Sequence, residues 1–105
     1  MTDNVKCITV LPRVDSNNAK QVEEQLLEAI QGGAQKLICD FSDNSYISSA
    51  GLRVFLSAMK LMTKSGGQLV ICSLSPFVRE VFDMAGFSQI FTICSNKEEA
   101  LAAVN

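Results

Sequence analysis

Two adjacent serines, Ser48 and Ser49, stand in the stretch YISSAGL, directly before a run of apolar residues at helical spacing. A serine in such a place can act as a nucleophile, cap the amino end of a helix, or accept a phosphoryl group from another protein. Each role needs different neighbours. The rest of the chain therefore decides among the three.

The nucleophile role lacks the groups it would need. Ser49-Ala50-Gly51 matches half of a G-x-S-x-G nucleophile elbow, but Ile47 stands where that turn needs glycine. The chain contains no histidine, so a Ser-His-Asp triad cannot be assembled. Lys60 and Lys64 lie well beyond the first turn of the expected helix. We therefore expect no catalytic residue and no enzyme activity.

The sequence also lacks the patterns of metal and cofactor sites. Histidine is absent, and the cysteines are widely spaced in apolar runs, where we expect buried, reduced thiols: Cys7, Cys39, Cys72 and Cys94. The glycine pairs at 32–33 and 66–67 follow helical patterns instead of opening them, so neither is expected to cradle a phosphate. We expect no metal and no cofactor.

Charge and hydropathy restrict the partners and the compartment. The net charge is −2 and the nine Lys and Arg residues are scattered singly, which argues against nucleic-acid binding. The longest apolar runs are far shorter than the ~20 residues of a membrane span, and residues 1–10 lack the layout of a signal peptide. We expect a cytoplasmic protein without a membrane span.

With 105 residues, 48% hydrophobic and 19% charged, the chain is expected to fold as one domain over 1–105. Apolar spacing and turn residues predict strands over 5–11, 36–41, 68–72 and 89–93. The same signals predict helices over about 17–31 and 49–64, a third from Pro76 toward Gly86 with Ser75 as its cap, and a closing helix that ends at Val104. Ser95 and Glu98 fit a capping box for this last helix.

Strands that alternate with helices require crossover connections, which give a largely parallel sheet covered by helices. The carboxyl ends of parallel strands then gather their loops at one edge, here 13–18, 42–49 and 73–76. One of the two serines suffices to cap the helix over 49–64, at a gain of ~1 kcal/mol. A cap alone does not explain the small pair Ala50-Gly51, which we interpret as leaving the backbone open to a close approach.

A family resemblance supplies a role for the second serine. The strings DFSDNSYISSAGLRVFL and GGQLVICSLSPFVREVFDMAGF resemble the STAS domain of the bacterial anti-sigma factor antagonists, and the likeness runs from Arg13-Val14-Asp15 to the closing helix. The resemblance implies a single STAS-like α/β domain with a mostly parallel or mixed sheet of four to five strands and about four helices. The chain departs from the family with Pro12 for glycine, Ser48 for aspartate, Ala50 for serine or threonine, and a shortened N-terminal hairpin.

In this family the pattern is D-S-[ST]-G-L, and its first serine is phosphorylated by a kinase that doubles as an anti-sigma factor. Counting back from Gly51-Leu52 places the acceptor at Ser49, with Ser48 as the second choice. The resemblance thus implies an anti-sigma factor antagonist that binds this serine kinase when unphosphorylated, is released on phosphorylation, and is restored by a phosphatase. The expected partner-binding residues are Asp15, Asp40, Asp43, Ser48, Ser49, Gly51, Leu52, Arg53, Ser73, Ser75 and Phe77.

Two alternatives stay open at this point. The chain could be a STAS docking subunit of a larger signalling or transport assembly that phosphorylation does not regulate. It could instead be a sensor of a small ligand or nucleotide. Partner binding that ignores Ser49 would favour the first, and calorimetry with nucleotides would test the second.

Overall fold

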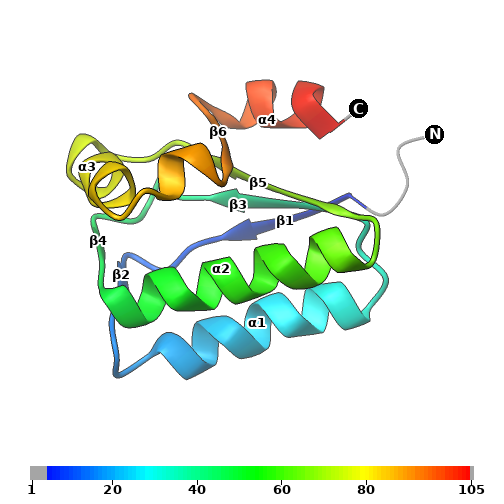
Figure 1. Ribbon diagram of the computed structural model, residues 1–105, viewed down its shortest axis with the longest axis horizontal. Helices are drawn as coiled ribbons and strands as arrows, with labels where there is room; N and C mark the ends of the chain where they lie inside the picture. Colours follow the sequence, from blue (N-terminus) through cyan, green and yellow to red (C-terminus); the bar gives the residue numbers. More distant parts are fainter. Residues whose placement is uncertain (1–4, 105) are drawn as a thin grey trace.

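A four-stranded parallel sheet forms the centre of the protein, whose structure, a computed structural model, describes residues 5–104 (Figure 1). Its strands are β1 (Val5–Thr9), β3 (Lys36–Asp40), β5 (Gln68–Cys72) and β6 (Thr92–Cys94). They lie in the spatial order β1-β3-β5-β6, and each neighbouring pair is parallel. The expected α/β class and largely parallel sheet are confirmed.

Four helices cover the two faces of this sheet unequally. They are α1 (Ala19–Gln31), α2 (Ser49–Lys64), α3 (Pro76–Met84) and α4 (Lys97–Val104). Figure 1 shows α1 and α2 side by side on one face, whereas α4 lies alone on the other. The expected helix count is confirmed, and α2 begins and ends where its apolar spacing predicts.

The two faces differ in how much they bury. On the side of α1, α2 and α3, fully buried aromatic rings fill the space, with Phe41 at 5.1 Å from Phe55 and 5.8 Å from Phe82 between ring centroids. On the side of α4, a small cluster joins Ala100 and Val104 to the sheet. The larger core thus anchors α2 and α3, two of the helices whose amino ends face the carboxyl edge of the sheet.

A second, very short sheet lies at that edge and was not predicted. It pairs β2 (Arg13–Val14) with β4 (Tyr46–Ile47) in parallel, with Arg13 opposite Tyr46. We expected both segments to be loops. Two residues are too few to show a strand period, and the pairing depends on tertiary contacts between segments more than 30 residues apart.

Two predicted strand boundaries are wrong. The first strand ends at Thr9, not at residue 11, and the next strand, β2, begins at Arg13. Part of the segment 89–93 belongs to a 3-10 turn, η1 (Phe87–Gln89), and β6 begins at Thr92. The Phe91 amide donates to the Phe87 carbonyl, and their rings pack 5.7 Å apart, so an aromatic pair favours a helical turn over an extended strand here.

Smaller corrections concern the closing helix and the thiols. The predicted capping box is shifted by one residue, because Asn96 accepts from the Glu99 amide and the Glu99 carboxylate accepts from the Ser95 amide. All four thiols are free, but Cys7 and Cys94 are only half-buried, whereas Cys39 and Cys72 are buried. Burial raises the pKa of the Cys39 and Cys72 thiols.

Candidate functional site

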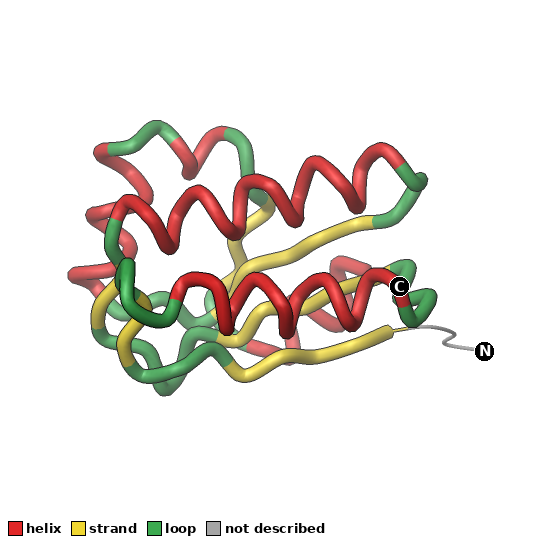
Figure 2. Tube along the Cα trace, turned by 90° about the horizontal axis from the view of Figure 1, so that it is seen from below, coloured by secondary structure: helices red, strands yellow, loops and turns green. Residues whose placement is uncertain are grey.

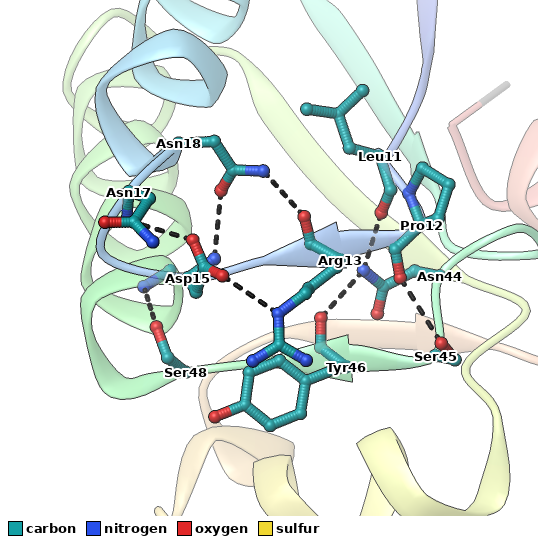
Figure 3. Close-up of polar contacts among 11 residues, drawn as sticks. Leu11, Pro12, Arg13, Asp15, Asn17, Asn18, Asn44, Ser45, Tyr46 and Ser48 are labelled. Carbon is teal, nitrogen blue, oxygen red and sulfur yellow. Dashed lines mark hydrogen bonds and ion pairs between the residues drawn. The ribbon is translucent and has the colours of Figure 1, made fainter.

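The loops that leave the carboxyl ends of β1, β3 and β5 meet at one edge of the main sheet, as the alternation of strands and helices predicts. The short sheet β2–β4 links the first two of these loops (Figure 3). The Ser45 amide donates to the Pro12 carbonyl and the Ser48 amide to the Val14 carbonyl, both at 2.9 Å. These bonds fix the backbone that leads into α2.

Asn44 is a buried polar residue that pins this edge from inside. It is only 3% exposed, and its Nδ2 donates to the Leu11 carbonyl at 2.7 Å and to the Tyr46 carbonyl at 3.0 Å (Figure 3). Because buried amides are costly when unpaired, these bonds hold the segment before α2 against the segment after β1. These two bonds fix the backbone position of Tyr46, which the two serines follow closely in the chain.

The two serines have different positions at the start of α2. Ser48 is the N-cap, with extended backbone and an Oγ that accepts from the Gly51 amide at 3.3 Å. Ser49 is the first helical residue, its side chain is exposed, and its hydroxyl has no hydrogen-bond partner among residues 5–104. The capping role and the exposed hydroxyl therefore belong to separate residues.

Gly51 and Leu52 lie beneath this surface, not on it. A Cβ on Gly51 would meet Val14 Cγ1 at 2.7 Å and Ile47 Cγ1 at 2.8 Å, and Leu52 is only 7% exposed. The close approach that we inferred from the small residues is real, but the approaching groups come from the chain's own short sheet. Gly51 and the Leu52 side chain therefore present little surface, and their part in a partner contact stays a prediction.

Asp15 is held in place at the end of β2. Its carboxylate accepts from Arg13 Nε at 2.9 Å and from the Asn17 amide at 2.9 Å, and the Asn18 side chain closes the turn (Figure 3). The hydrogen bond from Arg13 is the main cause that holds the pKa of the Asp15 carboxyl below its ordinary value, and the backbone amides of Asn17 and Asn18 act in the same direction. Asp15 thus presents a fixed negative charge at this edge.

Three side chains from different elements stack beside Asp15. The Arg13 guanidinium carbon lies 4.1 Å from the centroid of the Tyr46 ring, and the Phe77 ring stacks on Tyr46 at 6.4 Å with an interplanar angle of 17°. Phe77 is 53% exposed although it is a large apolar residue. Exposed aromatic and arginine side chains are the types enriched at protein interfaces. We name Arg13, Tyr46 and Phe77 the aromatic stack.

The remaining predicted residues lie around these groups. Asp43 and Arg53 are exposed, and half-buried Asp40 accepts from the Ser42 amide at 3.0 Å. Ser73 has a left-handed backbone with φ of 65°. Ser75 caps α3, since its Oγ accepts from the Val78 amide at 3.4 Å.

Arg13 and Tyr46 were not named individually as site residues from the sequence, although they lie in the loops 13–18 and 42–49 that were expected at this edge. Both stand beside predicted site residues, Arg13 two positions before Asp15 and Tyr46 just before the serines. An aromatic residue in a polar loop, two positions before a helix cap, is the signal that could have found Tyr46. That it stacks with Arg13 and Phe77 follows only from the tertiary structure.

The surface suits a protein partner better than a small ligand. A groove of about 610 Å³ lies elsewhere, between β1 and α1. Within residues 5–104 no cluster of side chains has the composition of a metal site, and no helix is long and apolar enough to cross a membrane. What the carboxyl edge offers is a free hydroxyl, a fixed carboxylate and the exposed ring of Phe77 on half-buried Tyr46.

Comparison with known proteins shows the family to which this chain belongs. The family profile of the STAS domain matches residues 1–100. The chain belongs to the STAS domain family. BtrV of Bordetella bronchiseptica, which is named as an anti-sigma factor antagonist, is 43% identical over 90 residues, which are 86% of this chain and 78% of BtrV.

Two further relatives agree in sequence and in fold. The anti-sigma-B factor antagonist of Bacillus subtilis is 32% identical to this STAS domain over 91 residues, 87% of this chain and 83% of its own. The structure of the anti-sigma factor antagonist SpoIIAA in its unphosphorylated form superposes with a TM-score of 0.81 at 25% identity, over 99% of this chain and 91% of SpoIIAA. The STAS fold expected from the sequence is confirmed.

Proposed function

We propose that this STAS domain is an anti-sigma factor antagonist that binds an anti-sigma factor through the carboxyl edge and is released when Ser49 is phosphorylated. The observation that supports this most directly is the exposed hydroxyl of Ser49 at the first position of α2, beside a neighbour that already serves as the cap. The names of the relatives at 43% and 32% identity point to the same class of partner.

The domain itself should tolerate the phosphate. A phosphoserine adds about −1.5 to −2 charges, and at the amino end of a helix the free amides and the helix dipole stabilise an anion. Ser49 occupies such a position, and its exposed side chain leaves room for three more oxygens. Phosphorylation is therefore expected to leave the fold intact.

The partner would experience the opposite effect. An interface that fits a neutral hydroxyl would have to desolvate a dianion, on an edge that already holds the fixed charge of Asp15 and the nearby Asp40 and Asp43. An unpaired charge in an interface costs several kcal/mol. Because each ~1.4 kcal/mol is tenfold in affinity, a loss of two to three decades is expected.

The chemistry of the transfer belongs to the partner. The Ser49 oxygen would attack the γ-phosphorus of ATP, its proton would pass to a base on the anti-sigma factor serine kinase, and ADP would leave. In the family pattern a separate phosphatase would reverse the step. The domain is thus substrate and not catalyst, and we place this cycle in the cytoplasm.

Ser49 is a better acceptor than Ser48 on structural grounds. The Ser48 hydroxyl accepts from the Gly51 amide, and its side chain is half-buried against the short sheet. Phosphorylation of Ser48 would remove the cap. It would also place a dianion near Asp15, because Val14 pairs with Ile47 and so brings the residues that follow them close together. Ser49 has neither restriction.

Incubation with the cognate kinase and Mg-ATP, followed by phosphopeptide mapping, tests the assignment. We expect label on Ser49, loss of label in Ser49→Ala, and continued labelling in Ser48→Ala. Calorimetry should give Ser49→Ala wild-type affinity for the kinase and Ser49→Asp at least about tenfold weaker binding. Ser57→Asp is the control, because it adds the same charge to an exposed site further along α2.

Three outcomes would overturn parts of the proposal. Label on neither serine would contradict regulation by phosphorylation. Tight kinase or partner binding that Ser49→Asp leaves unchanged would instead favour an unregulated docking subunit. Equal weakening by Ser57→Asp would show a general charge effect and not a local one.

A further inference from the structure

The edge of the main sheet at β1 is open in the part of the chain that the structure describes. Within residues 5–104, β1 pairs with β3 on one side and with no strand on the other. Figure 2 shows it along one border of the molecule, with no helix over that border. The groove of about 610 Å³ runs beside it, lined by β1 and by the flank of α1.

The backbone groups on the open side can be assigned from the ladder. The Val10 amide donates to the Asp40 carbonyl, and β1 is in parallel register with β3, for example Ile8 with Cys39. Alternate residues of a strand direct their N–H and C=O groups to the same side, so Lys6 and Ile8 face β3 as Val10 does. Val5, Cys7 and Thr9 therefore direct theirs outward.

We propose that β1 pairs antiparallel with β1 of a second copy of this chain, which joins two sheets into one of eight strands. In an antiparallel pair, directly opposed residues exchange two hydrogen bonds when both point toward each other. A two-fold axis at Cys7 opposes Cys7 to the second Cys7 and each Val5 to the other copy's Thr9. All outward groups of the two strands are then satisfied in one register.

The charges around the groove favour this occupant over a strand of arbitrary sequence. The flank of α1 that lines it bears Glu28, and Glu24 lies along the adjoining hollow. The side chains of Lys6 and Ile8 lie on the same face of β1, opposite to that of Cys7. This face is turned toward α1, because Ile8 packs in the core with Val22 and Leu26. The proposed register sets the second copy's Lys6 across from Ile8, over this acidic flank, where opposite charges attract.

The arrangement is compatible with the carboxyl-edge surface. Each β1 leads at its carboxyl end toward Arg13 and the aromatic stack. Because the two strands run in opposite directions, the two Ser49 sites lie at opposite ends of the joined sheet. The dimer would leave both sites free, so its failure and the failure of the proposed function are independent.

Proline and serine at position 7 give a matched pair of variants. Cys7→Pro removes an amide that points outward, so it spares the β1–β3 ladder and deletes both hydrogen bonds at the two-fold axis. Cys7→Ser keeps that amide. Sedimentation equilibrium under reducing conditions, from about 10 µM to about 1 mM, should show dimers for wild type and Cys7→Ser, with association at least about tenfold weaker for Cys7→Pro.

Hydrogen exchange on the unmodified protein provides a second readout that does not depend on a variant folding. The Cys7 and Thr9 amides should exchange more slowly as concentration rises, while the Ile8 amide, bonded to β3, should not respond. A wild-type chain that stays monomeric over the whole range overturns the proposal. So does a dimer that Cys7→Pro leaves unchanged, or protection of Cys7 and Thr9 that is independent of concentration.

Discussion

Two of the helices that begin at the carboxyl edge, α2 and α3, have first residues that correspond one to one. The cap is Ser48 in α2 and Ser75 in α3, and each hydroxyl accepts from the amide three residues on, at 3.3 and 3.4 Å. The first helical residue is exposed Ser49 in one and Pro76 in the other. Local helix geometry is therefore equal, and the side chains that follow each cap make the difference.

The difference suits the two amino ends to different parts in the proposed function, one as the modification site and the other as part of the contact surface. Proline at the first position has no hydroxyl and no amide, and the next residue of α3 is Phe77, which joins the aromatic stack. In α2 the corresponding residues are a free serine and Ala50. The two ends thus supply complementary parts of one surface.

The third positions differ for a packing reason. Both Gly51 and Val78 are buried, but only α2 lies so close to the short sheet that a Cβ cannot fit. The glycine is thus required by the proximity of β2 and β4, which in turn hold Arg13 and Tyr46 at the surface. Among the compared positions, substitution of Gly51 should therefore change the free energy of unfolding the most.

Gly51→Val is expected to lower the free energy of unfolding by about 2 kcal/mol, because the new side chain overlaps Val14 and Ile47. Ala50→Val, one residue earlier and half-buried, controls for the cost of a β-branched residue in a helix, about 0.5 kcal/mol. Chemical denaturation measures both. A Gly51→Val variant as stable as Ala50→Val would contradict the tight contact.

Loss of either cap should have a smaller and similar effect. Ser48→Ala and Ser75→Ala should each lower the free energy of unfolding by about 1 kcal/mol, since each leaves one amide of the first turn unpaired. Ser48→Asp should retain the stability, because aspartate caps equally well. Thermal melts at pH 7 measure these changes in stability. A Ser48→Ala variant as stable as wild type would mean that Ser48 is not the cap.

A negative charge at the first position of α2 should stabilise the fold slightly. Ser49→Asp is expected to raise the free energy of unfolding by about 0.5 kcal/mol at low salt, since the charge meets the helix dipole, and the gain should shrink as salt is added. Ser57→Asp, exposed within the same helix, should show no such gain. A Ser49→Asp variant less stable than Ser57→Asp would contradict a favourable interaction between this charge and the helix dipole.

The smallest expected effect concerns Asp15. Its pKa is held below the ordinary value of 3.8 chiefly by Arg13, so its charge contributes stability above the unfolded pKa that is lost as the pH falls through the folded pKa. Carbon NMR titration should show the low value, and Arg13→Ala should move it upward. The stability difference between wild type and Asp15→Asn should vanish toward acidic pH, and one that grows there would contradict this sign.

The sequence predicted most of the fold and about half of the site. Alternating strands and helices, the extent of α2, and Ser75 as a cap all follow from residues within three or four positions of one another, where side-chain spacing and capping act. Residues 89–91 also have local signals typical of a strand, yet β6 begins only at Thr92. The packing of Phe87 on Phe91 favours a turn there over the strand preference of these residues. The resemblance to the STAS family singled out Ser49, whereas no local pattern indicated that Arg13 and Tyr46 would stack on each other.

Within this chain, the sequence by itself determined that a serine-capped helix with a spare serine follows a polar loop. Only the tertiary structure decided that Ser48 caps, that Ser49 lies exposed, that Gly51 is sealed beneath, and that Arg13, Tyr46 and Phe77 stack. The physical reason is distance along the chain. Caps and helical spacing act within one turn, whereas the short sheet and the stack join segments more than 30 residues apart, which only a folded core can bring together.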